Sequence, residues 1–254
     1  MRSFVVDDLT VHVHDRDRDL AAAAAAAAAA AIDAAVRARG VAHVMLATGN
    51  SQLAFLDALT HRDDVDWSAV VGYHMDEYVG IPADHPASFR RYLRERVVDV
   101  VHPRAFEYVE GDAPDPEAAC RRYAALLAAH PLDLCCLGIG ENGHLAFNDP
   151  PVARFDDPQT VKVVDLDEAC RHQQVGEGHF PDLDAVPRQA ITVTIPALLA
   201  AARVLAVVPE ARKEAPVTAA LTGPVSTACP ASALRRAPQA TLYLDVDSAA
   251  GLAA

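Results

Sequence analysis

Short apolar runs alternate along this chain with longer amphipathic or alanine-rich segments. Apolar runs of about four to eight residues between turn residues predict buried strands, whereas an apolar repeat every three to four positions predicts helices. Strands are expected at 4–14, 41–47, 67–73, 106–109, 132–137, 160–166, 189–195, 204–208 and 241–246. Helices are expected at 20–39, 52–59, 88–101, 115–130, 167–175, 196–202 and 211–221. This alternation predicts a single-domain α/β fold over residues 1–254, with an open, mostly parallel sheet and helices on both faces.

The longest expected helix contains an unbroken run of alanines at 21–31. Alanine has the highest helix propensity, and the run is too short and too weakly hydrophobic to span a bilayer. The N-terminal residues lack the basic and apolar regions of a signal peptide. Five cysteines without a CxxC motif indicate a reducing compartment. We therefore expect a cytoplasmic protein.

The charge balance narrows the class of partner. The chain of 254 residues has 52% hydrophobic and 22% charged residues and a formal net charge of -13. The composition is that of a globular protein, and so acidic a chain repels nucleic acid and anionic membranes. Neither is expected as a partner. A small anionic substrate is still compatible with this net negative charge, because a local cluster of hydrogen-bond donors can outweigh the electrostatic field of the whole chain.

The strand expected at 132–137 ends in an unusual concentration of polar groups. Three glycines allow a tight turn and a close approach to the backbone: Gly138, Gly140 and Gly143. The turn delivers titratable or hydrogen-bonding side chains: Glu141, Asn142, His144, Asn148 and Asp149. Ligands of open α/β sheets bind at the carboxyl ends of strands. A functional cluster is expected here, and a glycine-rich connection with a solvated histidine is the alternative.

Three other positions carry polar groups at the ends of expected elements. Strand, polar loop and helix follow one another around Thr48, Gly49, Asn50 and Ser51, an arrangement that binds anions. The alternative is an ordinary turn with a serine helix cap. Asp76 and Glu77 follow the next strand, and Lys213 lies early in a late helix. A capping carboxylate and a solvated lysine are the alternatives for Asp76 and Lys213. A parallel sheet would bring all these groups to one edge.

The chemistry open to this set is limited. Ser51 has no base beside it in the sequence, and a carboxylate with a histidine suits proton transfer. Candidate zinc ligands are His74, His85, His144 and His179, yet neither HExxH nor the H-x-E and P-C-x-x-C pattern of zinc deaminases occurs. We therefore expect no catalytic metal.

Two long stretches, MDEYVGIPADHPASFRRYL at 75–93 and LGIGENGHLAFNDP at 137–150, resemble the glucosamine-6-phosphate deaminase family. That family is related to the 6-phosphogluconolactonases, and the resemblance extends over roughly residues 41–244. It implies a Rossmann-like fold of the deaminase/isomerase type. It also implies a cofactor-free reaction in which glucosamine 6-phosphate and water give fructose 6-phosphate and ammonia.

The resemblance assigns roles to single residues. Asp76 would move a proton between C2 and C1 of the opened sugar, and His144 would assist opening of the ring. Asn142 and Asp149 complete the expected catalytic group. The loop from Thr48 to Ser51, Lys213 and an arginine in 170–174 would hold the phosphate. Arg171 is the only arginine in that segment. The remaining expected substrate contacts are Glu77 and Gly140.

The chain departs from the family pattern at two positions. Asn142 replaces an aspartate, as in some family members, and Asp149 replaces a glutamate. A lactonase-like hydrolase is one alternative, although its relatives have a serine-rich stretch after the histidine. A non-catalytic sugar-phosphate-binding regulator is another, and galactosamine 6-phosphate is an alternative substrate. A homo-oligomer stays open too, because relatives include monomers and hexamers.

Overall fold

The computed structural model describes residues 1–176, 178 and 180–252, so His179 lies outside the described residues. The strands are β1 (Arg2–Val6), β2 (Leu9–His14), β3 (Ala42–Leu46), β4 (Val70–His74), β5 (Asp76–Tyr78), β6 (Ala105–Glu107), β7 (Leu134–Leu137), β8 (Val161–Asp165), β9 (Gln189–Val193), β10 (Arg203–Val208) and β11 (Ala240–Asp245). Eight of them form one sheet in the order β1-β2-β11-β10-β7-β3-β4-β6.

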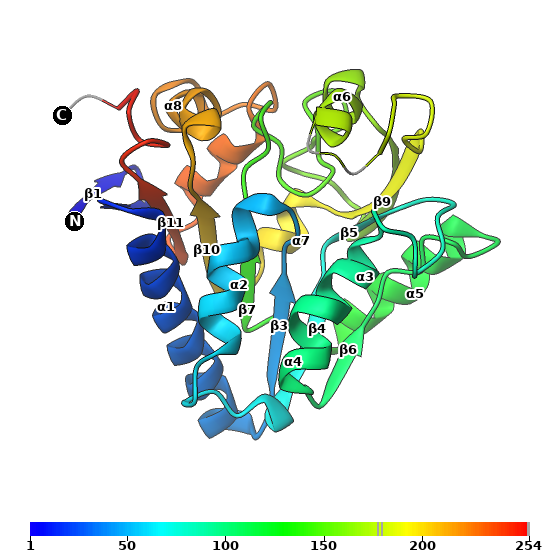
Figure 1. The fold of residues 1–254 in the computed structure, drawn as a ribbon, viewed down its shortest axis with the longest axis horizontal. Coiled ribbons are helices and arrows are strands. Elements are labelled where there is room, and N and C mark those ends of the chain that lie inside the picture. The colour runs from blue at the N-terminus through cyan, green and yellow to red at the C-terminus, as the bar shows by residue number, and fades with distance from the viewer. Residues whose placement is uncertain (177, 179, 253–254) are drawn as a thin grey trace.

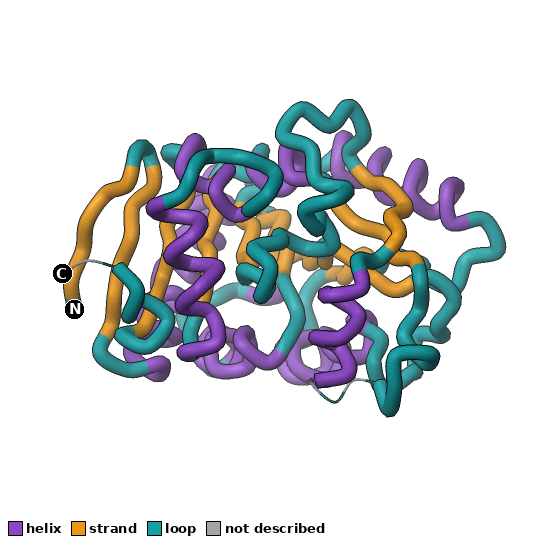
Figure 2. Tube along the Cα trace, turned by 90° about the horizontal axis from the view of Figure 1, so that it is seen from above, coloured by secondary structure: helices purple, strands orange, loops and turns teal. Residues whose placement is uncertain are grey.

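The α-helices are α1 (Asp17–Arg39), α2 (Leu53–Thr60), α3 (Phe89–Leu93), α4 (Asp99–Val101), α5 (Pro116–Ala129), α6 (Glu168–Gly176), α7 (Ile195–Leu199) and α8 (Glu214–Thr222). The 3-10 helices are η1 (Asn50–Gln52), η2 (Trp67–Ala69), η4 (Ala211–Lys213) and η5 (Pro230–Arg236). Helices lie on both sides of the sheet (Figures 1 and 2). One core cluster joins the sheet to α1 and α2, and another joins it to α5 and α8. The α/β fold with a mostly parallel sheet is confirmed.

The alanine-rich helix α1 packs on the sheet. Eight of its residues are buried, mainly alanines at helical spacing such as Ala24 and Ala28. The helix is long and apolar enough to cross a membrane by length and composition. Its apolar stripe is instead used against the strands, since α1 contacts β3, β10 and β11. The small side chains let the helix lie close to the sheet.

The N-terminal segment differs from the single strand expected at 4–14. β1 and β2 form an antiparallel hairpin in which Val6 pairs with Leu9, and Asp7 takes a positive φ of 52° at the turn. The alternating pattern continues through both strands and hides the turn. All other neighbouring pairs described in the eight-stranded sheet are parallel.

A second, three-stranded sheet has the order β5-β9-β8 and is antiparallel. The strands expected at 160–166 and 189–195 therefore do not join the large sheet. β5 was not expected at all, because its three residues, Asp76–Tyr78, are mostly polar. This small sheet lies beside α6 above the large sheet (Figure 1). Its own core contains Tyr78, Phe147, Cys170 and Phe180.

The helix expected at 88–101 is interrupted. A π-helical turn, η3 (Arg94–Val98), separates α3 from α4. Such turns insert an extra residue and occur often near functional sites.

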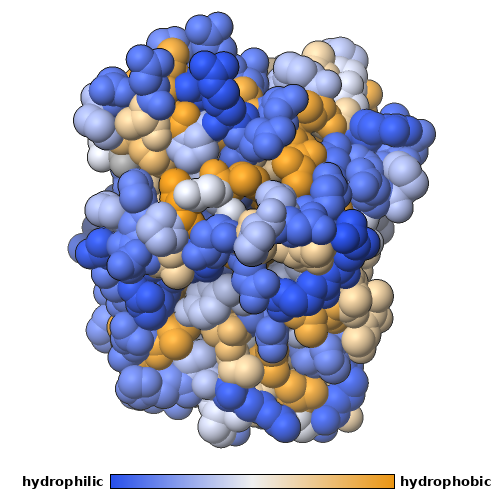
Figure 3. Space-filling model, turned by 90° about the vertical axis from the view of Figure 1, so that its right-hand side faces the viewer, coloured by the Kyte–Doolittle hydropathy of each residue, from blue (hydrophilic) through white to orange (hydrophobic). Residues whose placement is uncertain are grey.

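On the face drawn in Figure 3, hydrophobic residues form separate patches among hydrophilic ones.

Candidate active site

A pocket opens above the carboxyl ends of β3, β7 and β10, beside the small sheet. Its empty volume is about 640 Å3, which includes open solvent. It is lined by Ala47, Thr48, Gly49, Asn50, Ser51, Met75, Asp76, Phe89, Gly138, Ile139, Gly140, His144, Ala146, Phe147, Gln174 and Lys213. The structure thus brings together the three strand ends that the sequence singled out, together with Lys213.

The loop after β3 forms one wall of the pocket. Gly49 has a φ of 103°, which favours glycine, and its carbonyl accepts a hydrogen bond of 2.8 Å from the Tyr92 hydroxyl. Gln52 is 1% exposed and donates to the carbonyl of Val207, 3.0 Å away on β10. Neither Tyr92 nor Gln52 was expected to have a role from the sequence, because no pattern in it marks their contacts with this loop. Together they fix the loop between α3 and β10.

Lys213 lies at the end of η4, directly before α8. Its side chain lines the pocket and the residue is only 3% exposed. A largely buried ammonium beside an exposed polar loop complements an anion. The loop after β3 and Lys213 are called the anion side of the pocket below.

Asp76 opens the small sheet, where it pairs with Thr192 of β9. The residue is 7% exposed and its side chain lines the pocket. Burial raises the pKa of Asp76 well above its ordinary value of 3.8, and the nearby Glu77 and Asp149 raise it further. A carboxyl group in this setting can accept and return a proton near neutral pH.

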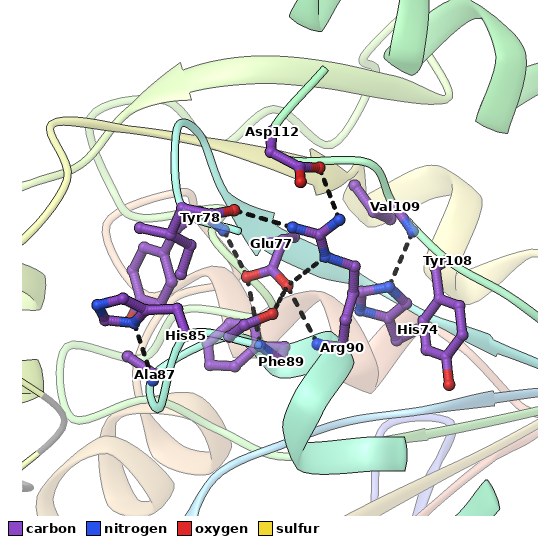
Figure 4. Close-up of polar contacts among 12 residues, drawn as sticks. His74, Glu77, Tyr78, His85, Ala87, Phe89, Arg90, Tyr108, Val109 and Asp112 are labelled. Atoms are coloured by element: carbon purple, nitrogen blue, oxygen red, sulfur yellow. Dashed lines mark hydrogen bonds and ion pairs between the residues drawn. The ribbon is translucent and has the colours of Figure 1, made fainter. Parts of the chain in front are cut away.

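Glu77, which was expected to contact the substrate, is not among the residues that line the pocket. Its carboxylate accepts hydrogen bonds from Ser88 Oγ at 2.6 Å and from the backbone N–H of Arg90 at 3.0 Å, at the start of α3 (Figure 4). The Arg90 side chain also contacts it at 3.3 Å. Neighbouring residues of a strand face opposite sides, so Asp76 and Glu77 point apart. Glu77 anchors α3 behind the pocket.

His74, a candidate zinc ligand, is fully buried beside the same network. Its Nε2 accepts a hydrogen bond of 2.9 Å from the backbone N–H of Val109 (Figure 4). Burial, together with Arg90, lowers the pKa of His74 to about 3. It is a neutral structural imidazole at the end of β4.

The glycines after β7 make room for His144. A Cβ atom on Gly140 would lie 2.2 Å from Nε2 and Cε1 of the His144 ring. Gly143 has a φ of 84°, and a Cβ there would lie 2.8 Å from Cys229 Sγ. Gly140 therefore serves as the surface on which the imidazole rests, and no other residue fits without moving it.

His144 faces Asp149 through its Nδ1. The distance from Nδ1 to Asp149 Oδ1 is 2.9 Å. Asn142 bridges the two: Nδ2 donates to Asp149 Oδ1 at 2.8 Å, and Oδ1 accepts from the His144 backbone N–H at 3.0 Å. The second ring nitrogen is left on the side of Gly140 and the pocket. Asn142 and Asp149 thus contact His144 and are not among the residues that line the pocket.

Asp149 is 1% exposed. Burial favours the neutral acid, but the contacts with His144, Asn142 and Cys170 outweigh it and hold the pKa of Asp149 below its ordinary value of 3.8. Asp76 and Asp149 are therefore driven in opposite directions. Pairs of titratable groups with opposed environments are typical of acid–base catalysis. Asp76, His144, Asn142 and Asp149 are called the proton side of the pocket below.

One group of described residues has the donors of a metal site. The ligand atoms of His144, Asp149 and Cys170 all lie within 4.8 Å of one another. Such a set resembles a three-ligand zinc site with an open position. His144 Nδ1 and Asp149 Oδ1 lie 2.9 Å apart, whereas Asp149 Oδ2 has no hydrogen-bond partner among the described residues.

Arg171, which was expected to contact the phosphate, is not among the residues that line the pocket. Its guanidinium donates to the carbonyls of Leu183 at 2.5 Å and Val186 at 3.2 Å. The residue of α6 that lines the pocket is Gln174, whose Oε1 accepts a hydrogen bond of 2.6 Å from the Tyr78 hydroxyl. The sequence identified residues 170–174 as a segment near the pocket, but it did not show which side of this helix faces the pocket.

Comparisons with known proteins identify the family of this chain. The model of a family described as glucosamine-6-phosphate isomerases/6-phosphogluconolactonase matches residues 15–243. A glucosamine-6-phosphate deaminase of Bacillus cytotoxicus is 34% identical over 217 residues, which is 85% of this chain and 80% of that protein.

Solved structures resemble the chain as well. A monomeric glucosamine-6-phosphate deaminase superposes with a TM-score of 0.86 at 29% identity, covering 95% of this chain and 99% of the other. A 6-phosphogluconolactonase from Shewanella baltica has a TM-score of 0.77 at 20% identity, with 95% and 99% covered. The second likeness supports the fold alone.

Proposed function

This chain belongs to the family of glucosamine-6-phosphate isomerases and 6-phosphogluconolactonases, and from that premise we propose that it is a glucosamine-6-phosphate deaminase. The reaction converts glucosamine 6-phosphate and water to fructose 6-phosphate and ammonia. The observation that carries the proposal is the pairing of Asp76 and His144, two proton-transfer groups of different electrostatic setting, in one pocket with an anion side. We place the enzyme in the cytoplasm, acting without a cofactor.

Asp76 is the proposed proton carrier. It removes the proton from C2 of the opened sugar and returns it to C1, while the amino nitrogen loses a proton and the C1 oxygen gains one, so that C1 becomes an alcohol and the 2-amino group an imine. Water adds to that imine, C2 becomes a ketone, and ammonia leaves. Because burial and Glu77 hold the pKa of Asp76 high, the carboxylate is a stronger base than an exposed aspartate.

His144 is the proposed acid–base group for ring opening. Its Nδ1 is held by Asp149, so Nε2 is the nitrogen available on the pocket side. Opening a pyranose requires a proton at the ring oxygen and loss of one from the C1 hydroxyl. Imidazole carries protons in both directions near neutral pH.

The anion side is the proposed phosphate site. Thr48, Asn50 and Ser51 offer hydroxyl, amide and backbone donors, and Lys213 supplies a positive charge. Donors of this kind match the three oxygens of a phosphate group.

The substrate test offers three compounds to the purified protein: glucosamine 6-phosphate, galactosamine 6-phosphate and 6-phosphogluconolactone. We expect ammonia and fructose 6-phosphate in equal amounts from the first compound. Lactone hydrolysis without ammonia release would replace the proposal by a lactonase. Binding of glucosamine 6-phosphate in a calorimeter without turnover would favour a regulator. Faster turnover of galactosamine 6-phosphate would make that compound the substrate and leave the proposed deamination reaction unchanged.

A further inference from the structure

Helix α6 brings a buried cysteine to the proton side of the pocket. Cys170 is 1% exposed, and its Sγ lies within 4.8 Å of both the His144 Nδ1 and a carboxylate oxygen of Asp149. We propose that Cys170 is a positioning residue: its thiol donates a hydrogen bond to Asp149 and holds that carboxylate against His144. The role rests on the proposed deaminase function, because it acts on that reaction through His144.

The Cys170 thiol is suited to donate a hydrogen bond and not to act as a nucleophile. Burial raises the pKa of Cys170 above its ordinary value of 9.0, and the negative charge of Asp149 raises it further. Cys170 therefore keeps its proton at neutral pH, and a protonated thiol is a donor and a poor nucleophile. The nearby Cys170 thiol in turn favours the ionised form of Asp149.

Asp149 needs this third contact because it is buried and charged. Asn142 and His144 both approach its Oδ1, at 2.8 Å and 2.9 Å. A carboxylate that is 1% exposed loses its hydration, and each further donor reduces that cost. The Cys170 thiol is the contact that comes from α6, across from the loop that carries His144.

The helix that carries Cys170 is fixed at further points. Arg171 ties it to the carbonyls of Leu183 and Val186, and Gln174 accepts from the Tyr78 hydroxyl. Cys170 itself lies in the core of the small sheet with Tyr78. The thiol is thus held by packing and has little freedom to leave Asp149. This is the geometry expected of a residue that orients a catalytic pair.

Asp149 does not line the pocket, so it influences substrate only through the orientation and charge of His144. A loss of its third donor should therefore lower kcat and leave substrate binding on the anion side unchanged.

The test compares Cys170→Ala with Cys170→Ser, which keeps a donor. We expect Cys170→Ala to lower kcat about tenfold with KM within about twofold, because a hydrogen bond to a charged group contributes about that factor or more. Cys170→Ser should stay within about threefold of wild type. The matched control is Cys120→Ala in α5, where another cysteine is 2% exposed in the core away from the pocket. It should lower stability and leave kcat unchanged.

A double-mutant cycle separates positioning from general packing. In an Asp149→Asn background, Cys170→Ala should cause no further loss of kcat, because the acceptor it orients has changed. Full additivity of the two changes would overturn the proposal. Equal kcat for wild type and Cys170→Ala would overturn it too, as would equal losses in the alanine and serine variants. If Cys170→Ala does not fold, the pair Cys170→Thr and Cys170→Val, which differ in one donor, replaces it.

A readout without turnover keeps this inference distinct from the proposed function. If wild type releases no ammonia, the deaminase proposal fails by itself. The His144 ring-proton resonance then reports on the contact: it should shift in Cys170→Ala and stay near its wild-type position in Cys170→Ser. An unchanged resonance in both variants would show that the thiol does not act on the pair.

Discussion

The two sides of the pocket are built in different ways. The anion side stands on the ends of β3 and β10 in the large parallel sheet, and its loop residues Thr48 to Ser51 are half-buried or exposed. The proton side stands on the small antiparallel sheet, the glycine turn after β7 and helix α6, and its carboxylates are buried. The loop of the anion side offers donors to solvent, whereas the carboxylates of the proton side are held away from it.

The difference separates binding from chemistry. Loop donors and a lysine contribute affinity for a phosphate and need no unusual protonation state. Buried carboxylates are costly, because desolvation penalises their charged form, and they are retained where that penalty adjusts a proton-transfer group. We therefore expect changes on the anion side to raise KM, and changes on the proton side to lower kcat.

His144→Gln should have a severe effect on the proton side. It removes the imidazole and keeps a hydrogen-bonding side chain, so kcat should fall about 1,000-fold, within the usual range for an acid–base group. Steady-state kinetics with glucosamine 6-phosphate measures it. The control is His61→Gln, at an exposed histidine of the α2 end, which should match wild type. A KM change without loss of kcat would place His144 in binding only.

Gly140→Ala tests the surface under the imidazole. The new methyl group would meet the ring at 2.2 Å, so His144 must move, and kcat should fall about 100-fold because misplaced catalytic groups lose about that factor. Gly176→Ala is the matched control, since nothing lies within 4 Å of its added Cβ. Wild-type kcat in a folded Gly140→Ala variant would contradict the geometry.

Lys213→Met should act on the other side. Loss of a charge-assisted contact to phosphate should raise KM about 10- to 100-fold, with kcat within about threefold. The control is Lys162→Met, because Lys162 is also largely buried but is paired with Asp157 at 2.8 Å outside the pocket. That control should lower the melting temperature and leave KM unchanged. A kcat loss as large as that of His144→Gln would remove the division between the two sides.

Asn142→Ala should have the smallest effect of the series. It removes one donor to Asp149 and one acceptor for the His144 backbone, while the direct contact of 2.9 Å between those residues is kept. We expect kcat to fall about threefold and KM to stay constant. A drop as large as for His144→Gln would mean that Asn142 itself contacts the reacting sugar.

The two sides of the pocket also differ in how well they could be predicted from the sequence. The anion side follows from strand ends in a parallel sheet, a rule that needs only the strand pattern. The proton side depends on β5, which is three residues long and mostly polar, so no hydrophobic pattern marks it. Had β5 been recognised, the alternation of strand side chains would have separated Asp76 from Glu77.

Helix α6 shows a second limit. The family resemblance predicted a phosphate-binding arginine in residues 170–174, and Arg171 is the only arginine in that segment. Successive helical residues are rotated by about 100°, so a shift of one position changes the side that faces the pocket. Cys170 and Gln174, four positions apart, share the face toward the site, and Arg171 points to the loop at 183–186. Side-chain direction on a short polar helix is set by tertiary contacts.

The most direct test of the division between binding and chemistry is Asp76→Asn, measured for turnover, binding and stability together. A raised folded-state pKa means that, above about pH 3.8, the folded protein holds a proton that the unfolded chain has lost. Stability from this group therefore falls as pH rises toward the folded pKa. Asparagine cannot ionise, so the Asp76→Asn variant does not lose this folding stability as the pH rises.

For Asp76→Asn we predict no detectable ammonia release, calorimetric binding of glucosamine 6-phosphate close to wild type, and a higher melting temperature at pH 7. The gain in melting temperature should vanish below about pH 3.8, where the wild-type carboxyl is neutral in both states. Retained turnover, or a lower melting temperature in a folded variant at pH 7, would contradict the assignment of Asp76 as a buried base.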